Sequence, residues 1–261
     1  MKIDGTIAIV TGASSGIGAS TAVELARRGA TVVVAARRAK ELEATADACR
    51  AHTAGSFAVT ADLGEVEECE RLVATVEDKL GGVDILVNNA GISLHRHALA
   101  TSAADVERVM QVNFLSAVRT TMAALPGMVD RHRGSIINVT SVAGAIPNPK
   151  ESAYGASKAA LQLWSHGLAV DLDGTGVHVG VLSPGPIDTP IWAMDEEVAY
   201  TGPKFPPQVV ADGIVKMIEG ALVHLTVPRR YGAVGAVYGL PLIGRAMRRG
   251  LVGYERKAQK K

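Results

Sequence analysis

Seven short apolar runs, separated by longer helical patterns, constrain the fold of this chain more than any other feature. The runs cover residues 6–12, 31–36, 56–61, 83–89, 134–141, 177–183 and 224–228, and the segments between them are rich in Ala, Leu, Glu and Arg. Continuous rather than alternating apolar residues indicate strands that are buried on both faces. The pattern predicts an α/β fold, a doubly wound seven-stranded parallel sheet with helices on both faces.

The length of the chain favours one domain of this kind. A chain of 261 residues with 48% apolar content can close one large core, and no Pro/Gly/Ser-rich linker interrupts the first 228 residues. We expect a single Rossmann-type domain over residues 1–228. A tail over residues 229–261 follows it and carries nine lysines and arginines against one acid.

Several classes of protein are disfavoured by the composition. Cys49 and Cys69 lack metal-ligand spacing, and His95 and His97 have no third ligand nearby, so no metal site is predicted. The first apolar run is too short for a secretory signal, and no apolar stretch approaches the length of a membrane span, so a cytoplasmic location is expected. No basic residues interleave with aromatic ones, which argues against nucleic-acid binding.

A glycine cluster, TGASSGIG at residues 11–18, follows the first predicted strand. Gly12 can turn the chain sharply, Gly16 can let backbone approach a phosphate, and Gly18 can let a helix pack tightly on the sheet. The helix that begins here would point free N–H groups at an anion. Glycines also serve plain turns, and the spacing departs from the commoner G-x-G-x-x-G pattern.

Two arginines follow the second predicted strand. Ala36, Arg37 and Arg38 stand where many NAD-binding units carry an acid for the ribose 2′-hydroxyl. Without that acid a 2′-phosphate is not repelled, and a guanidinium offers it a bidentate partner. We therefore predict a preference for NADP(H) over NAD(H), although the arginines also fit a solvated helix start.

A tyrosine and a lysine stand four residues apart in SAYGASK at residues 152–158. Four residues advance a helix by about 400°, so Tyr154 and Lys158 share one face. A free phenol titrates near 10, and a cation at contact distance lowers that pKa toward the range of a working acid or base. Alone, the pair is also compatible with two ordinary surface residues. Asn113 adds a carboxamide to the apolar stripe of a helix predicted over residues 103–129, where it is either a satisfied core amide or functional.

These motifs, taken in order, resemble the short-chain dehydrogenase/reductase family in its compact single-domain form. The resemblance runs from about Thr6 to Pro228 and also includes ADL at 61–63, NNAG at 88–91, NVTSVAG at 138–144 and SPGPIDTP at 183–190. The 13-residue separation of Ser141 from Tyr154 fits the family's pattern.

The resemblance implies four catalytic residues. Tyr154 would be the general acid in carbonyl reduction and the base in alcohol oxidation, and Lys158 would lower its pKa and bind the nicotinamide ribose. Ser141 would hold the substrate oxygen, and Asn113 would bind a water through its distorted helix and so link Lys158 to bulk solvent. Taken singly, Ser141 also fits a strand-end cap.

The resemblance also implies a cofactor site along the carboxyl ends of the strands. Asp62 and its loop would meet the adenine, Asn88 to Gly91 would run beside the adenine ribose, and Ile187 and Thr189 would meet the carboxamide. Asp62 also fits a helix N-cap and Thr189 an ordinary loop hydroxyl. Together the expected cofactor residues are Gly12, Ser14, Ser15, Gly16, Ile17, Gly18, Arg37, Arg38, Asp62, Leu63, Asn89, Ala90, Gly91, Tyr154, Lys158, Pro184, Gly185, Ile187 and Thr189. Some NADP(H)-preferring members carry a basic residue where this chain has Ser15, so the preference depends on Arg37 and Arg38.

The function implied is an NADP(H)-dependent oxidoreductase that interconverts a carbonyl and a secondary alcohol by hydride transfer. Trp192, Met194, Tyr200 and Phe205 suggest an apolar lid and a lipophilic substrate. The alternatives are a non-catalytic dinucleotide-binding sensor or scaffold, an NAD-linked alcohol dehydrogenase, and an epimerase or dehydratase on a related scaffold. The resemblance also implies a homodimer or homotetramer, because family members commonly pair the helix that follows Tyr154.

Three interpretations of the tail over residues 229–261 stay open. It could rest on an anionic membrane surface as a basic amphipathic segment, cover a neighbouring subunit or the substrate mouth, or be solvated. Its six glycines and Pro241 argue against one long helix.

Overall fold

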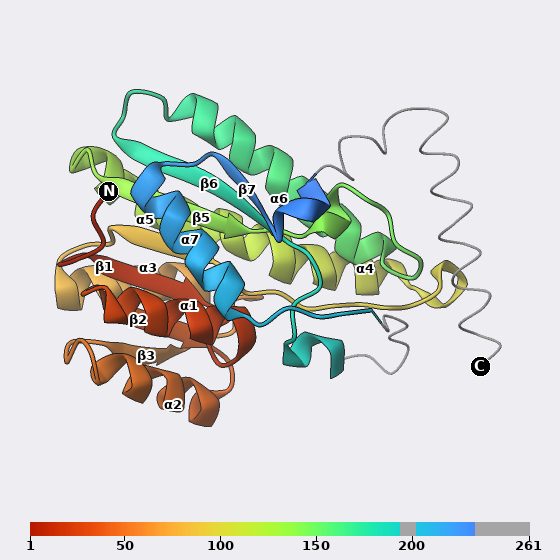
Figure 1. Ribbon diagram of the computed structural model, residues 1–261, viewed down its shortest axis with the longest axis horizontal. Coiled ribbons are helices and arrows are strands. Elements are labelled where there is room, and N and C mark those ends of the chain that lie inside the picture. The colour runs from red at the N-terminus through yellow and green to blue at the C-terminus, as the bar shows by residue number, and fades with distance from the viewer. Residues whose placement is uncertain (194–201, 233–261) are drawn as a thin grey trace.

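A computed structural model describes residues 1–193 and 202–232 of the chain. Seven parallel strands form one sheet in the order β3-β2-β1-β4-β5-β6-β7 (Figure 1). The strands are β1 (Ile7–Thr11), β2 (Thr31–Ala36), β3 (Phe57–Thr60), β4 (Ile85–Asn88), β5 (Gly134–Val139), β6 (Val177–Pro184) and β7 (His224–Val227). The predicted fold class is confirmed, and each apolar run contains one strand.

Helices cover both faces of the sheet. Helices α1 (Gly16–Arg27), α2 (Ala39–Arg50) and α7 (Gln208–Gly220) share one apolar core with the sheet. Helices α3 (Val66–Leu80), α5 (Ser116–Asp130) and α6 (Ser152–Asp171) share a second core on the opposite face. In β1, Ala8 and Val10 face the first core whereas Ile9 faces the second. Burial on both faces explains why the strands read as continuous apolar runs.

The helix predicted over residues 103–129 is divided into three parts. Helix α4 (Ala103–Met110) leads into a π-helical turn, η2 (Gln111–Leu115), and α5 continues from Ser116. The widened turn contains Asn113, whose carboxamide is buried. Such turns occur often at functional sites, and here the distortion coincides with the buried carboxamide of Asn113.

Short 3₁₀ turns lie where the chain leaves several strands. They are η1 (Ala98–Ala100), η3 (Val142–Gly144), η4 (Pro190–Ala193) and η5 (Arg229–Tyr231). The tail begins in η5, where the Tyr231 ring packs on Gly185, and residues 233–261 lie outside the described part of the chain. Within residues 1–193 and 202–232, no helix has the length and apolar content that crossing a membrane requires.

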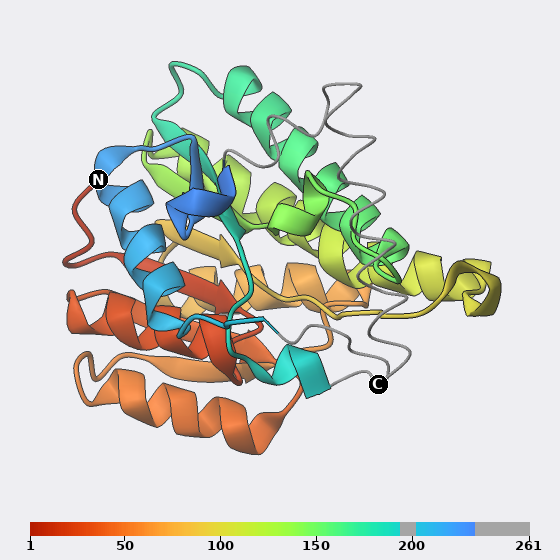
Figure 2. The same cartoon turned by 45° about the vertical axis from the view of Figure 1, so that its right-hand side comes forward.

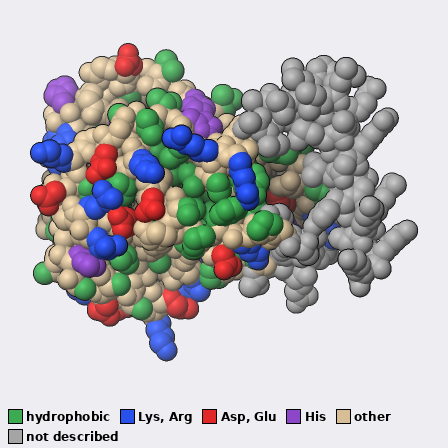
Figure 3. Space-filling view, in the orientation of Figure 1, with side chains coloured by type: hydrophobic (Ala, Val, Ile, Leu, Met, Phe, Trp, Pro, Cys, Tyr) green, Lys and Arg blue, Asp and Glu red, His purple; other side chains and the backbone are tan. Residues whose placement is uncertain are grey.

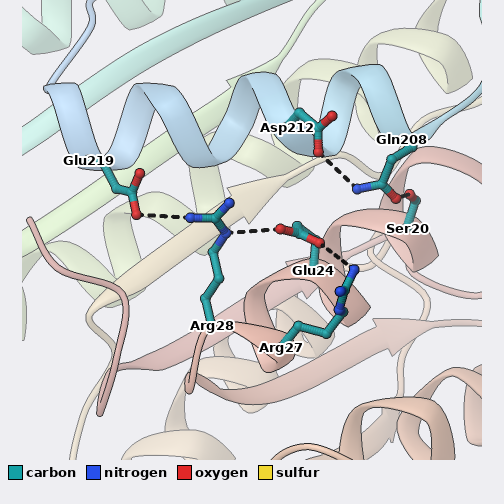
Figure 4. A network of polar contacts seen from close by, with 7 residues as sticks. All are labelled: Ser20, Glu24, Arg27, Arg28, Gln208, Asp212 and Glu219. Atoms are coloured by element: carbon teal, nitrogen blue, oxygen red, sulfur yellow. Dashed lines mark hydrogen bonds and ion pairs between the residues drawn. The ribbon is translucent and has the colours of Figure 1, made fainter.

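A polar network joins α1 to α7 (Figure 4). The Arg28 guanidinium, just after α1, donates to Glu24 at 2.9 Å and to Glu219 of α7 at 3.1 Å. Near the other end of α1, the Ser20 hydroxyl donates to Gln208 at 3.0 Å. Exposed pairs of this kind each add little stability, but contacts at both ends fix how α1 lies against α7.

The strands run toward the right of Figure 1, where their carboxyl ends lie, and α4 extends outward on that side in Figure 2. On the face drawn in Figure 3, charged side chains are spread over the left part, whereas hydrophobic ones gather toward the right. From β1 the chain adds β2 and then β3 on one side of the sheet, and from β4 it adds β5, β6 and β7 on the other side. The direction of winding therefore reverses between β1 and β4. Ligands of open α/β sheets bind in the crevice at such a switch point.

Removing buried volume from the centre of the sheet should destabilise the fold. Leu86 in β4 is 0% exposed, so Leu86→Ala should lower the free energy of unfolding by about 2–5 kcal/mol, measured by urea titration. Leu99 is 94% exposed, and Leu99→Ala as the control should change it by less than about 0.5 kcal/mol. Equal losses in the two variants would contradict this assignment of the core.

Candidate active site

The glycine cluster forms a tight turn between β1 and α1 at the switch point. Gly12 has φ +65° and Gly16 has φ +57°, a backbone region that glycine adopts without strain. A Cβ on Gly12 would lie 2.8 Å from the Ala90 Cα, and one on Gly18 would lie 2.5 Å from the Gly12 carbonyl oxygen. Gly12 and Gly18 are therefore required by a close approach of backbone, whereas Gly16 is required by its positive φ and by the nearby Thr189 side chain.

The neighbouring Asn89 holds this turn in place. Its side-chain amide donates to the carbonyl oxygens of Thr11 at 2.9 Å and Gly12 at 3.3 Å, and its backbone N–H donates to the Thr11 hydroxyl at 3.0 Å. The same hydroxyl accepts from the Ala90 N–H at 3.0 Å. The strand end of β4 and the glycine turn thus form one rigid unit.

Asn88 does not lie where the resemblance places it. Its side chain is buried between the sheet and α5, where it donates to Asn138 at 2.8 Å and Thr121 at 2.9 Å and accepts from Thr120 at 2.7 Å. The expectation that Asn88 runs beside the adenine ribose is wrong for its side chain. Successive side chains of a strand point to opposite faces, so Asn88 and Asn89 cannot both face the crevice.

The two arginines lie next to the glycine turn. The Arg38 guanidinium donates to the Ser14 hydroxyl at 3.0 Å and to the Ser15 hydroxyl at 2.7 Å. Arg37 lies 3.9 Å from the Asp62 carboxylate. A cation and two hydroxyls therefore stand at the carboxyl end of β2, beside the N-terminus of α1, and they form a suitable place for a phosphate.

Three other expected cofactor residues have partners of their own. The Asp62 carboxylate accepts the Gly64 N–H at 3.0 Å within the loop after β3, and the N-cap of α3 is Glu65 rather than Asp62. Leu63 packs its side chain into the core, so only its backbone can face a ligand. Ile17 packs against the first core from the first turn of α1.

The segment after β6 closes the crevice from the other side. A Cβ on Gly16 would lie 2.9 Å from the Thr189 side chain, so this segment touches the glycine turn. The Gly185 N–H donates to the Val227 carbonyl at 2.8 Å, next to Pro184 at the end of β6. The Ile187 carbonyl accepts from the Trp192 indole at 2.6 Å. Met194 and Tyr200 of the expected lid lie outside the described residues.

The four expected catalytic residues meet at the ends of β4 and β5. Lys158 is buried, and its ammonium lies 5.9 Å from the Tyr154 ring and donates to the Val139 carbonyl at 3.0 Å. The Ser141 side chain hydrogen-bonds with that of Tyr154, and its Oγ also accepts the Ala143 N–H at 3.1 Å. Ser141 is therefore both a cap of η3 and a neighbour of the phenol.

Asn113 reaches the same space from the widened turn η2. Its carboxamide exchanges two hydrogen bonds with the backbone of Ile92, at 2.7 and 2.9 Å, and donates to the Ser157 hydroxyl at 3.0 Å. A Cβ on Gly91 would lie 3.3 Å from Asn113 Oδ1 and 3.4 Å from Lys158 Nζ. Asn113 and Lys158 therefore line one space beside Gly91.

The protonation of Tyr154 differs from the expectation. Burial raises the pKa of Tyr154 to about 12, the hydrogen bond with Ser141 opposes this, and the negative charge of Glu151 adds to it. Burial also lowers the pKa of Lys158 to about 8. In the protein alone the pKa of Tyr154 is raised rather than lowered, and burial is the largest cause. At neutral pH the pair is a phenol beside an ammonium.

Glu151 is a residue near the site that no sequence motif indicates. This acid precedes α6, and its carboxylate bonds to His95, which lies 56 residues earlier in the chain. No local spacing signals a contact between positions so far apart.

Comparison with known proteins agrees with this arrangement. The family model described as short chain dehydrogenase matches residues 6–198. A short chain dehydrogenase from Pseudocercospora fijiensis is 36% identical over 200 residues, which are 76% of this chain and 64% of that relative. The ketoacyl reductase HetN from Nostoc sp. is 33% identical over 229 residues, covering 86% of this chain and 79% of HetN.

Solved structures share the whole fold. A short chain dehydrogenase/reductase from Burkholderia phymatum in complex with NAD has a TM-score of 0.86 at 25% identity, covering 94% of this chain and 96% of that one. A single-residue variant of actinorhodin polyketide ketoreductase with NADPH has a TM-score of 0.79 at 29% identity, covering 87% of this chain and 97% of that one. The chain belongs to the short-chain dehydrogenase/reductase family, a family of NAD(P)-dependent oxidoreductases.

A side chain at position 18 should displace the glycine turn and weaken cofactor binding. A methyl group there would lie 2.5 Å from Gly12 O and 2.6 Å from Asn89 Nδ2, so Gly18→Ala should weaken NADPH binding by at least about tenfold in titration calorimetry. Gly220→Ala, at the end of α7, would place its methyl 3.5 Å from Leu222 and should bind NADPH like wild type. Unchanged affinity in Gly18→Ala would contradict the placement of the cofactor at this turn.

Proposed function

We propose that this chain is an NADP(H)-dependent oxidoreductase that interconverts a carbonyl and a secondary alcohol. The observation that carries the proposal is the meeting of Tyr154, Ser141, Lys158 and Asn113 beside Gly91, at the carboxyl edge of the sheet. The adjoining glycine turn brings β1, the start of α1 and the end of β4 close together, because a Cβ at Gly12 or Gly18 would collide with backbone atoms, and the N-terminus of α1 beside it suits a dinucleotide phosphate. The bound nicotinamide would supply or accept the hydride.

Tyr154 would move the proton. In carbonyl reduction its Oη would donate a proton to the substrate oxygen, and the Ser141 hydroxyl would donate a second hydrogen bond to that oxygen. A pKa of about 12 keeps the phenol protonated at neutral pH, which suits the acid role. The Lys158 ammonium nearby would stabilise the phenolate left after the transfer.

Asn113 and Lys158 would return the proton to Tyr154. Both side chains line the space beside Gly91, which supports a water held between the carboxamide and the ammonium as the route to solvent. The widened turn η2 gives Asn113 its position, because a regular helix would turn this residue toward a different neighbour.

Two cations support a preference for NADP(H). The chain places Arg37 and Arg38, and no acid, directly after β2, and Arg38 is held over the glycine turn by Ser14 and Ser15. A 2′-phosphate would accept from the same guanidinium and hydroxyls. Because the similar structures contain NAD in one case and NADPH in the other, the preference depends on these residues.

Apolar and aromatic side chains near the crevice support a lipophilic substrate. Trp192 and Phe205 lie on the segments that follow β6, and Phe205 pairs with Ile187 through an isolated bridge. A homodimer or homotetramer that pairs α6 between subunits is supported by Leu163 and Val170, each 75% exposed on that helix. Contact of the tail with a membrane stays a sequence-based hypothesis, because residues 233–261 are outside the described part.

The proposed role of Arg37 and Arg38 in the preference for NADP(H) can be tested by comparing the affinities for NADPH and NADH. Wild type should bind NADPH at least about tenfold more tightly than NADH, a gap of about 1.4 kcal/mol in titration calorimetry. Arg38→Ala should lose this gap by weakening NADPH binding and leaving NADH binding unchanged. Arg27→Ala, which removes an exposed arginine paired with Glu24, is the control. A protein that prefers NADH would contradict the proposal.

The acid role of Tyr154 separates an enzyme from a dinucleotide-binding scaffold. Tyr154→Phe should keep NADPH affinity within about twofold and lower the rate of NADPH oxidation with an aryl ketone by about 10²–10⁴-fold. Tyr231→Phe, outside the catalytic group, serves as the matched control. Undiminished turnover in Tyr154→Phe would exclude the phenol as the acid.

A further inference from the structure

One hydrogen-bonded histidine–glutamate pair joins two segments beside the candidate active site. His95 lies in the loop after β4, and Glu151 is the residue that precedes α6. His95 Nε2 and Glu151 Oε1 are 2.6 Å apart. The ring of Trp192, from the segment after β6, lies 6.0 Å from the His95 ring. Segments that follow three different strands therefore meet at His95.

The pair is built into the protein. The His95 side chain is 9% exposed and that of Glu151 is 12% exposed. His95 Nδ1 lies 2.8 Å from the Ser93 hydroxyl, and the Asn148 amide donates to the second Glu151 oxygen at 2.8 Å. The Ser93 hydroxyl can donate or accept, so it can serve either form of the imidazole. A nearly buried carboxylate needs such partners, since an unpaired one is costly.

Glu151 also lies close to the proposed acid. Its carbonyl accepts the Gly155 N–H at 2.7 Å, so Glu151 begins the first turn of α6, and Tyr154 follows three residues later. Residues three apart on a helix are neighbours. The negative charge of Glu151 contributes to the raised pKa of Tyr154.

We propose that His95 and Glu151 are a positioning pair for Tyr154, in which His95 holds the Glu151 carboxylate and the loop after β4 against the first turn of α6. The Glu151 charge adds to the effect of burial in keeping the Tyr154 phenol protonated. The inference rests on the proposed function for the acid role of Tyr154.

Other charged groups near the pair and the phenol have defined places. Lys158 lies 5.9 Å from the Tyr154 ring, and its ammonium donates to the Val139 carbonyl. Arg96, next to His95, pairs with Asp105 of α4 at 3.0 Å. Lys204 lies over the Trp192 ring at 4.9 Å.

The titration of Tyr154 tests the role of the Glu151 charge. Carbon-13 at Cζ of the five tyrosines reports phenolate by NMR, and Tyr154→Phe assigns the signal of Tyr154. Glu151→Gln keeps an acceptor for His95 and removes the charge, so the Tyr154 titration should move to lower pH by about one unit. Glu70→Gln, on the exposed side of α3, is the control and should leave it unchanged. A Glu151→Gln titration that coincides with wild type would overturn the proposal.

Hydrogen exchange tests the role of His95 with variants that leave Glu151 intact. In His95→Ala, amides of residues 92–100 should exchange at least about fivefold faster, because the tie to α6 is lost. His95→Gln, whose amide can still donate to Glu151, should restore slow exchange. Leu99→Ala, which truncates a 94% exposed side chain of the same loop, should match wild type. Exchange in His95→Ala that matches Leu99→Ala would overturn the proposal.

Neither measurement requires turnover. Both are made on the full chain with and without NADP⁺. Failure of the proposed function would show instead as absent NADP⁺ binding, or as absent reduction in the separate activity assay. Failure of the positioning pair would show as an unmoved Tyr154 titration or unmoved exchange in a protein that still reduces carbonyls.

Discussion

The close approach of backbone at the switch point between β1 and β4 is the constraint on which the rest of the site depends. Gly12 meets Ala90 and Gly18 meets Gly12 at distances that leave no room for a side chain, and Asn89 hydrogen-bonds across the same junction. This junction fixes the direction of α1 and the end of β4 relative to each other. Arg38 hydrogen-bonds to the glycine turn, and Gly91 follows Asn89 and Ala90 of the same junction. The proposed phosphate site at Arg38 and the proposed catalytic site beside Gly91 are therefore held by the same junction.

Burial determines the pKa shifts of the two titratable residues at the proposed catalytic site. Tyr154 and Lys158 lie away from water, which raises the pKa of the phenol and lowers that of the ammonium. Both shifts favour the neutral forms, yet a pKa of about 8 leaves Lys158 mostly charged at neutral pH. A protonated phenol with a nearby cation is suited to giving up a proton to a developing alkoxide. Glu151 acts in the same direction as burial, and His95 keeps it in place.

The sequence predicted those features that depend on local pattern. Buried strands appear as continuous apolar runs, so all seven strands and both covered faces could be predicted, and glycines required by close contacts appear as a cluster. The resemblance implied a distorted helix at Asn113, but the residue spacing did not predict that the helix divides there, because a π-helical turn leaves no spacing signature. The side chain of Asn88 was placed in the crevice, although the alternation of a strand turns it into the core beside Asn138. The direction of the Tyr154 pKa shift depends on burial, and the pairing of His95 with Glu151 depends on tertiary contact, so neither follows from the order of residues.

The most direct test of carbonyl reduction is transfer of a labelled hydride. The protein would be incubated with NADPH that carries deuterium at both C4 positions and with a panel of aryl and long-chain ketones, and the alcohols would be analysed by mass spectrometry. We expect at least one ketone to yield a secondary alcohol with one deuterium at the carbinol carbon. Tight binding of NADPH without transfer to any ketone of the panel would contradict reduction of such carbonyls and favour a dinucleotide-binding scaffold.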